Sequence, residues 1–158
     1  MGGGLLAHKV LAIYASRCTG CRICEQWCAY QHHGAVSPAH ARITVQQLHL
    51  RSAPIACNQC RRAPCIAACP SGAISRDPMS GGLQLDAEAC VGCRLCLEAC
   101  PRACIKMDAE VGVPLLCDLC GGEPQCARHC PEGAILCLEL DLVDRAYRDD
   151  LVAGKEVL

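Results

Sequence analysis

Cys90-Val-Gly-Cys-Arg-Leu-Cys-Leu-Glu-Ala-Cys-Pro101 is the stretch that decides the fold of this 158-residue chain. Two residues separate each of its first three cysteines, and a fourth cysteine follows after three more residues, directly before a proline. Groups of this kind occur four times along the chain. They are Cys18, Cys21, Cys24 and Cys28; Cys57, Cys60, Cys65 and Cys69; Cys90, Cys93, Cys96 and Cys100; and Cys117, Cys120, Cys126 and Cys130. Cys104 and Cys137 stand outside these groups.

The four groups form an internal repeat. Three of them end in Cys-Pro followed by an aligned tail, as in Cys69-Pro-Ser-Gly-Ala-Ile74 and Cys130-Pro-Glu-Gly-Ala-Ile135, whereas the first has Ala29 after its last cysteine. The second and fourth groups are stretched between their second and third cysteines, by residues 61–64 and 121–125. These stretches read as loops that keep all four sulfur ligands.

The spacing predicts [4Fe–4S] clusters. A Cys-x2-Cys-x2-Cys loop supplies three thiolates to one cube, and in the bacterial two-cluster ferredoxin pattern the cysteine before proline binds the other cluster. Sixteen cysteines in four groups therefore predict four clusters. Two other scaffolds are less favoured: disulfides do not require this repeated spacing, and zinc sites use cysteine pairs, often with histidine, which is not at ligand spacing here.

Composition supports a metal scaffold in place of an ordinary core. The chain has eighteen Cys but no Phe, one Trp and three Tyr, so few large side chains can fill an interior. The formal net charge is −1, and no Lys/Arg block longer than a pair suggests nucleic acid as a partner. No apolar run approaches the roughly 18 residues of a membrane helix, so we expect no direct membrane insertion. The chain begins with Met1 and shows no charged leader before a long apolar stretch, so we expect it to be cytoplasmic.

Local patterns predict an α+β fold of short elements. The Val-, Ile- and Leu-rich segments 6–14 and 42–50 read as strands, and 83–85 as a shorter strand after a turn at 78–82. Short helices are expected from the third cysteine of each group, ended by proline. The final segment, 142–152, reads as an amphipathic helix.

The order of two compact and two stretched motifs resembles the four-cluster ferredoxin-like subunits of oxidoreductases. This family includes the small iron–sulfur subunits of DMSO reductase, formate dehydrogenase, hydrogenase and tungsten aldehyde oxidoreductase type enzymes, and the resemblance covers roughly residues 9–138. It implies a single polyferredoxin domain, 1–158, of two interleaved two-cluster units. The outer unit would come from about 9–32 and 111–138, the inner unit from about 53–106, with a C-terminal tail at 139–158.

The resemblance also implies how the motifs pair, a choice that spacing alone leaves open. The first motif pairs with the fourth, and the second with the third, by exchange of the last cysteine. The implied ligand sets are Cys18, Cys21, Cys24 and Cys130; Cys28, Cys117, Cys120 and Cys126; Cys57, Cys60, Cys65 and Cys100; and Cys69, Cys90, Cys93 and Cys96.

The expected function is electron transfer. No catalytic nucleophile, paired carboxylates or phosphate loop is visible, so we expect a subunit that relays single electrons and is not itself an enzyme. The expected partners are a catalytic oxidoreductase subunit, of molybdenum or tungsten type such as an aldehyde oxidoreductase, and a second redox protein. A free diffusible polyferredoxin and, more remotely, a zinc-binding interaction module are the alternatives.

Other conspicuous residues receive simpler interpretations. Cys104 and Cys137 read as small core residues, and the pair Arg61-Arg62 as solvated or docking residues. Trp27 and Tyr30 are expected to pack against the first cluster and exclude water. The remaining expectations concern polar residues: a surface location for His32, His33, His40 and His49, and no acid–base role for the isolated Glu25 and Glu98.

Overall fold

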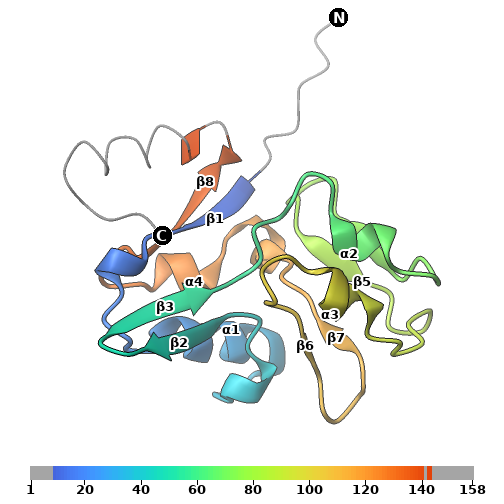
Figure 1. Cartoon of the computed structure of the whole chain (residues 1–158), viewed down its shortest axis with the longest axis horizontal. Coiled ribbons are helices and arrows are strands. Elements are labelled where there is room, and N and C mark those ends of the chain that lie inside the picture. The colour runs from blue at the N-terminus through green and yellow to red at the C-terminus, as the bar shows by residue number, and fades with distance from the viewer. Residues whose placement is uncertain (1–8, 141, 144–158) are drawn as a thin grey trace, which may run out of the picture.

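The computed structural model describes residues 9–140, 142 and 143, and within them the chain is a small α+β protein of short elements (Figure 1). Its strands form four separate two-stranded antiparallel sheets. The pairs are β1 (Lys9–Ile13) with β8 (Ile135–Glu139), β2 (Thr44–Leu48) with β3 (Arg51–Ile55), β4 (Ile74–Arg76) with β5 (Leu83–Leu85), and β6 (Lys106–Met107) with β7 (Pro114–Leu115).

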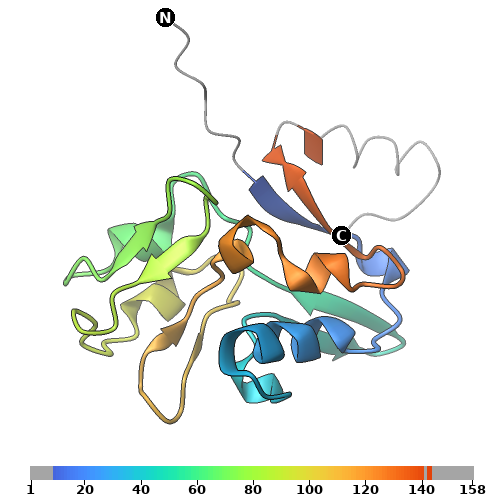
Figure 2. The same ribbon diagram turned by 180° about the vertical axis from the view of Figure 1, so that it is seen from behind.

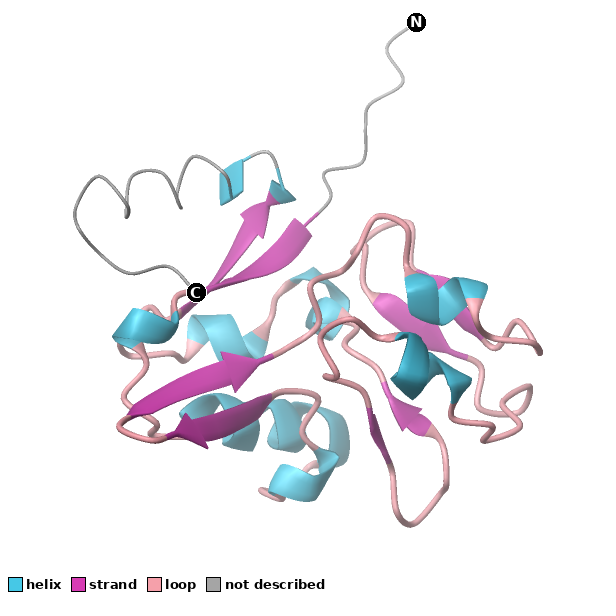
Figure 3. Cartoon of the chain, viewed as in Figure 1, coloured by secondary structure: helices cyan, strands magenta, loops and turns pink. Residues whose placement is uncertain are grey.

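The helices are short as well, as Figure 3 shows in cyan. They are η1 (Ala15–Arg17), α1 (Ile23–His33), η2 (Pro38–His40), α2 (Pro64–Ala67), α3 (Leu95–Ala99), η3 (Leu119–Gly122) and α4 (Gln125–Arg128). As expected, α1 to α4 each begin next to the third cysteine of a motif. No helix among the described residues is long and apolar enough to cross a membrane.

The two ends of the described chain lie together. β1 pairs along its whole length with β8, from Lys9 opposite Glu139 to Ile13 opposite Ile135. The view from behind shows α1 and α4 side by side beneath this sheet (Figure 2). The middle of the chain, with α2, α3 and the hairpins β4–β5 and β6–β7, forms a second lobe beside them (Figure 1).

The interior is built from small residues and sulfur. One cluster of buried residues joins Leu11, Ile13 and Ile135 to cysteines of α1 and α4, and another joins Ile74, Leu83 and Leu116 to cysteines of α2 and α3. Cysteine therefore occupies the position that large apolar side chains take in an ordinary core.

One strand was missed by the sequence analysis. The strand expected over 42–50 is β2, which ends at Leu48 because the chain turns at His49, whose φ is +53°, and returns as β3. The sequence did not predict β3 because it contains Pro54. Proline donates no backbone hydrogen bond and is tolerated in a sheet mainly on edge strands. The strand expected over 6–14 is β1, and residues 6–8 lie outside the described part of the chain. Of the helix expected at 142–152, only residues 142 and 143 are described.

Candidate iron–sulfur sites

All four motifs share one backbone geometry. The residue before the second cysteine has a positive φ in each motif: Gly20 (+75°), Gln59 (+49°), Gly92 (+66°) and Leu119 (+55°). The third cysteine then stands at the start of a helix, and all four third cysteines are buried. Left-handed backbone at Gln59 and Leu119 is costly and persists only where the surroundings enforce it. In each motif, this left-handed residue turns the loop so that its cysteines face a common point.

The first motif meets the last cysteine of the fourth. Cys18, Cys21, Cys24 and Cys130 line one small cavity, which Val45 and Ile135 help to enclose. Cys24 is buried, whereas Cys21, which lines the same cavity, is exposed. Burial, reinforced by the nearby Glu25 and Cys130, raises the pKa of Cys24 to about 12. A metal cluster that binds this thiolate must therefore displace a tightly held proton.

The second motif meets the last cysteine of the third. Cys57, Cys60, Cys65 and Cys100 line a second small cavity, together with Cys104. The Sγ atoms of Cys100 and Cys104 are 3.5 Å apart. The Cys104 thiol donates a hydrogen bond to the Cys57 sulfur, which lowers the pKa of Cys57 against the effect of burial.

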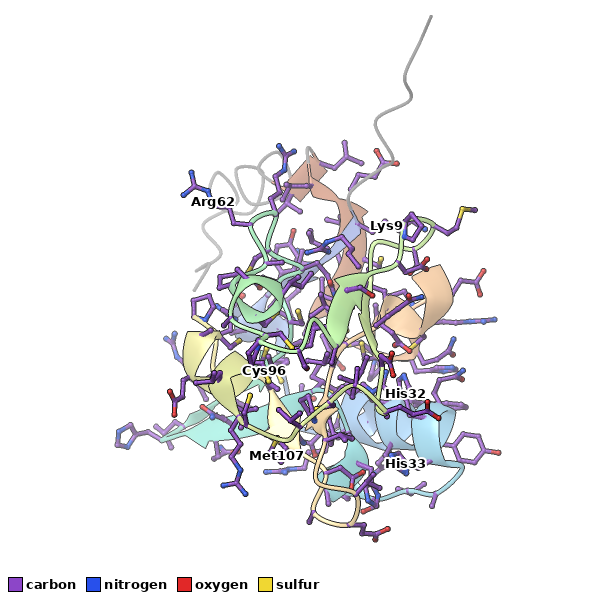
Figure 4. The ribbon with its side chains drawn as sticks, turned by 90° about the vertical axis from the view of Figure 1, so that its right-hand side faces the viewer. Lys9, His32, His33, Arg62, Cys96 and Met107 are labelled. Carbon is purple, nitrogen blue, oxygen red and sulfur yellow. The ribbon has the colours of Figure 1, made fainter. Side chains whose placement is uncertain are left out.

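The third motif meets the last cysteine of the second. Cys69, Cys90, Cys93 and Cys96 line a third cavity, closed by Ile74, Met107 and Pro114. Cys96 is buried and lies inside the lobe in Figure 4, and Cys93 is exposed. The first and third sets thus each present one exposed cysteine to solvent.

The fourth set gathers Cys28, Cys117, Cys120 and Cys126. Burial raises the pKa of Cys126 well above its usual value, and the neighbouring Cys117, Cys28 and Cys120 raise it further. The backbone N–H of Arg42 donates to the Cys28 sulfur over 3.2 Å. This set is the most enclosed of the four, because both Cys28 and Cys126 are buried and neither Cys117 nor Cys120 is exposed.

A charged network borders the fourth set. Asp118 accepts hydrogen bonds from the Nε2 of His32 at 3.0 Å and from the backbone of Cys120 at 2.9 Å, and pairs with Arg42 at 2.9 Å. Burial opposes the charged forms, but these partners outweigh it: they lower the pKa of Asp118 and raise that of His32 to about 9. The side chain of His32 is only 8% exposed, so the expectation of a surface histidine is wrong for this residue.

Two further expectations fail because of how α1 faces the core. The helix buries Cys24, Glu25, Cys28 and Ala29, so positions 27 and 30 point outward. Tyr30 is 53% exposed, and Trp27 stacks on His129 with ring centroids 3.7 Å apart. Neither aromatic ring shields the first cavity. As expected, Arg61 and Arg62 lie on the surface, where Arg62 extends outward in Figure 4.

Glu25 has a structural role that the sequence did not reveal. Its side chain is only 2% exposed, accepts a hydrogen bond from the backbone N–H of Val45 at 2.6 Å and pairs with Arg22 at 3.4 Å. It thereby fastens α1 to β2 beside the first motif. A glutamate directly after a cysteine carries no sequence signal for such a contact.

The donor chemistry fits iron–sulfur clusters. All eighteen cysteines lie in the described part of the chain, and none of them forms a disulfide. Soft thiolate donors converge in fours, a donor set that suits iron–sulfur clusters and zinc. Backbone N–H groups reach sulfur, as from Gln59 to Cys57 at 3.4 Å, and hydrogen bonds of this kind tune cluster potentials.

Comparison with known proteins agrees with this chemistry. Residues 48–140 match the 4Fe-4S dicluster domain family. The chain belongs to this family. It is 38% identical, over 77% of its length and 71% of the relative, to the aliphatic sulfonate oxidoreductase polyferredoxin-like subunit of Pyrococcus furiosus. It is also 36% identical to the putative electron transport protein YsaA of Escherichia coli, over 87% of this chain and 94% of that one.

Among solved structures, a chain of the active site complex BamBC of benzoyl coenzyme A reductase has a similar fold. The TM-score is 0.50 at 24% identity, and the match covers 92% of this chain and 89% of that one. The family and these two curated relatives establish a 4Fe–4S electron-transfer protein, and the Pyrococcus furiosus relative is itself a subunit of an oxidoreductase.

Proposed function

We propose that the protein holds four [4Fe–4S] clusters and relays single electrons along them between a catalytic oxidoreductase subunit and a second redox partner. The observation that carries the proposal is the grouping of sixteen cysteines into four sets, three of which line separate cavities. Each set combines three cysteines of one motif with the last cysteine of another. This exchange is typical of two-cluster ferredoxins.

The proposed ligand sets follow this grouping. They are Cys18, Cys21, Cys24 and Cys130; Cys28, Cys117, Cys120 and Cys126; Cys57, Cys60, Cys65 and Cys100; and Cys69, Cys90, Cys93 and Cys96. Shared cavities support three of these sets, and the mutual electrostatic effects of the cysteines support the set of Cys28, Cys117, Cys120 and Cys126.

The same grouping favours two interleaved units. We assign residues 9–32 and 111–138 to an outer unit, which the pairing of β1 with β8 and the packing of α1 on α4 support. Residues 53–106, in which α2 packs on α3, make the inner unit inserted between its halves.

The clusters would supply the redox chemistry. The chain's own residues would control the access of water and partners to the clusters and the stability of negative charge on sulfur. Buried third cysteines keep water from the cavities, N–H and S–H donors stabilise negative charge on sulfur, and the exposed Cys21 and Cys93 mark where partners can approach. Electron transfer is steeply dependent on distance, so the two sets with exposed cysteines are the proposed points of entry and exit.

The first test is metal and sulfide analysis of anaerobically purified protein. Four clusters require about sixteen iron and about sixteen sulfide per chain. Electron paramagnetic resonance after dithionite reduction should show interacting reduced clusters. About twelve iron per chain would show that one proposed ligand set does not hold a cluster. Zinc without sulfide would overturn the proposal in favour of a zinc-binding module.

The second test concerns the partner. We propose a molybdenum or tungsten oxidoreductase in the cytoplasm, on the strength of the family resemblance and the free cysteines. Affinity purification from the native host should recover a large subunit that contains one of these metals. Recovery of a free monomer under the same conditions would instead identify a diffusible polyferredoxin.

A further inference from the structure

A second group of metal-binding side chains lies outside the sixteen cysteines, where three segments of the chain meet. His33 ends α1, His40 ends η2, and Asp108 begins the turn between β6 and β7. The donor atoms of these three side chains all lie within 4.8 Å of one another. Figure 4 shows His33 on the side of the molecule where the β6–β7 hairpin, which carries Met107, packs.

The ring of each histidine lies near one carboxylate. Their rings stack with centroids 4.0 Å apart and an angle of 17° between the planes. The Nε2 of His33 is 4.0 Å from the Oδ2 of Asp108, and the Nε2 of His40 is 3.9 Å from an Oε1 of Glu110. Imidazole nitrogen is a donor to transition metals, but its lone pair lies in the ring plane, so the two rings would turn out of the stack to bind one cation together.

A repeated turn within the same chain shows what is unusual about Asp108. Asp77 begins the equivalent turn between β4 and β5, and both of its carboxylate oxygens accept hydrogen bonds, from Met79 and Ser80. Asp108 accepts two backbone hydrogen bonds, both through Oδ1, because Val111 stands where the other turn has serine. No described residue donates a hydrogen bond to its Oδ2, which faces His33 in a side chain only 4% exposed.

The chemistry of this group selects a divalent transition metal. Imidazole nitrogen suits zinc, copper, iron and nickel, whereas magnesium and calcium prefer shells made only of oxygen. Neighbouring donors of a tetrahedral zinc site are roughly 3.3 Å apart, given bonds of about 2.0–2.1 Å. The observed separations of 3.9 and 4.0 Å lie close to that value, and Glu110, 79% exposed, is free to rotate inward.

We propose that His33, His40 and Asp108, with Glu110 as a fourth donor, bind one Zn²⁺ ion that is separate from the iron–sulfur clusters. The ion would fasten α1 and η2 of one lobe to the β6–β7 hairpin of the other. Lys106 already bridges the same junction through its Nζ, which donates to the carbonyl of Pro38 at 3.1 Å. The ligands come from three separate segments of the chain. The ion would therefore act as a structural crosslink between these segments.

The test uses anaerobically purified holoprotein with its full iron content, so that the cluster cysteines are not available to zinc. The protein is incubated with micromolar Zn²⁺ and desalted, and zinc and iron are measured per chain. About one zinc should remain, with only nitrogen and oxygen neighbours in its X-ray absorption spectrum. The variants His33→Ala, His40→Ala and Asp108→Asn should each retain at least tenfold less zinc while keeping their iron.

His49→Asn is the matched control, because His49 is an exposed histidine at the β2–β3 turn and asparagine tolerates its left-handed backbone. This variant should bind zinc like the unmodified protein. Equal zinc retention in the His33 and His40 variants would overturn the site, as would zinc–sulfur distances near 2.3 Å or no retained zinc in the unmodified protein. Glu110→Ala, at an exposed position that should not affect folding, should weaken zinc binding without changing iron content.

Discussion

Cys104 illustrates at the scale of single residues how a small side chain can tune a neighbouring site. Its thiol donates to the Cys57 sulfur and lies 3.5 Å from that of Cys100, both proposed ligands of one cluster. Because a donor to ligand sulfur favours the more negative, reduced cluster, Cys104→Ala should lower one reduction potential. A weak hydrogen bond of about 1 kcal/mol corresponds to roughly 40 mV for one electron.

Redox titration followed by electron paramagnetic resonance would measure this change. Cys137→Ala is the control, since Cys137 lies in β8 opposite Leu11 and has no sulfur contact of this kind. Alanine is also the natural choice at position 104, because Ala73 and Ala134 occupy the same place in the repeated tails. Identical potentials in all three proteins would show that Cys104 only fills space.

Glu25 gives a second prediction at this scale. Glu25→Ala leaves the buried N–H of Val45 without its acceptor and should lower the free energy of unfolding by about 1–3 kcal/mol. Glu98→Ala removes an exposed carboxylate from α3 and should change that free energy by no more than about 0.5 kcal/mol. Anaerobic denaturant unfolding compares the two, and equal effects would contradict the structural role of Glu25.

At the scale of elements, α1 departs from the other three helices because its motif lacks proline. The helix continues past Cys28 to His33, whereas α3 ends before Cys100-Pro101. Ala29→Pro would remove a helix hydrogen bond inside α1 at a fully buried position and should cost about 3 kcal/mol or more.

The circular dichroism of this variant should show lost helix, and its apparent melting temperature should fall. Pro101→Ala, at an exposed position outside a helix, should cost less than about 1 kcal/mol. A native-like Ala29→Pro protein would mean that α1 need not extend beyond Cys28.

The tails after the last cysteines provide a further prediction. Gly72 and Gly133 have φ values of +66° and +60°, and the third tail places Ala103 in the same left-handed region at +48°. Ala103→Gly should therefore raise the free energy of unfolding by about 0.5–1 kcal/mol, because glycine adopts this backbone without steric cost. Anaerobic thermal unfolding would measure the gain.

The reverse change is the control. A Cβ at Gly72 would meet no atom within 4 Å, so Gly72→Ala tests the backbone alone and should destabilise by a similar amount. If both variants were less stable than the unmodified protein, the left-handed backbone at Ala103 would not be strained.

At the scale of the whole molecule, stability should depend on the clusters. The two main groups of core residues are both built around cysteines, and many of their other members are small. Removal of iron with a chelator under oxidising conditions should therefore abolish the far-ultraviolet circular dichroism signal of the fold, since metal binding and folding are coupled. Dithionite reduction without loss of iron should leave that signal intact, and an apoprotein with a native spectrum would contradict this prediction.

The sequence by itself determined the features that depend on local spacing. Cysteines two residues apart can reach the same cube, so the four motifs, the cluster type and the family followed from the chain alone. The α+β class and the helix starts at the third cysteines followed from the same short-range patterns. Proline after the last cysteine also marked correctly where the helix of the third motif ends.

Only the tertiary structure decided which distant residues meet. Spacing left open which motif supplies the last cysteine of each set, and the antiparallel pairing of β1 with β8 brings Cys130 to the first motif. The burial of His32 and Glu25 and the outward position of Trp27 depend on which face of α1 packs inward. The physical reason is that contacts between residues far apart in the chain are set by how whole elements pack, which no local pattern records.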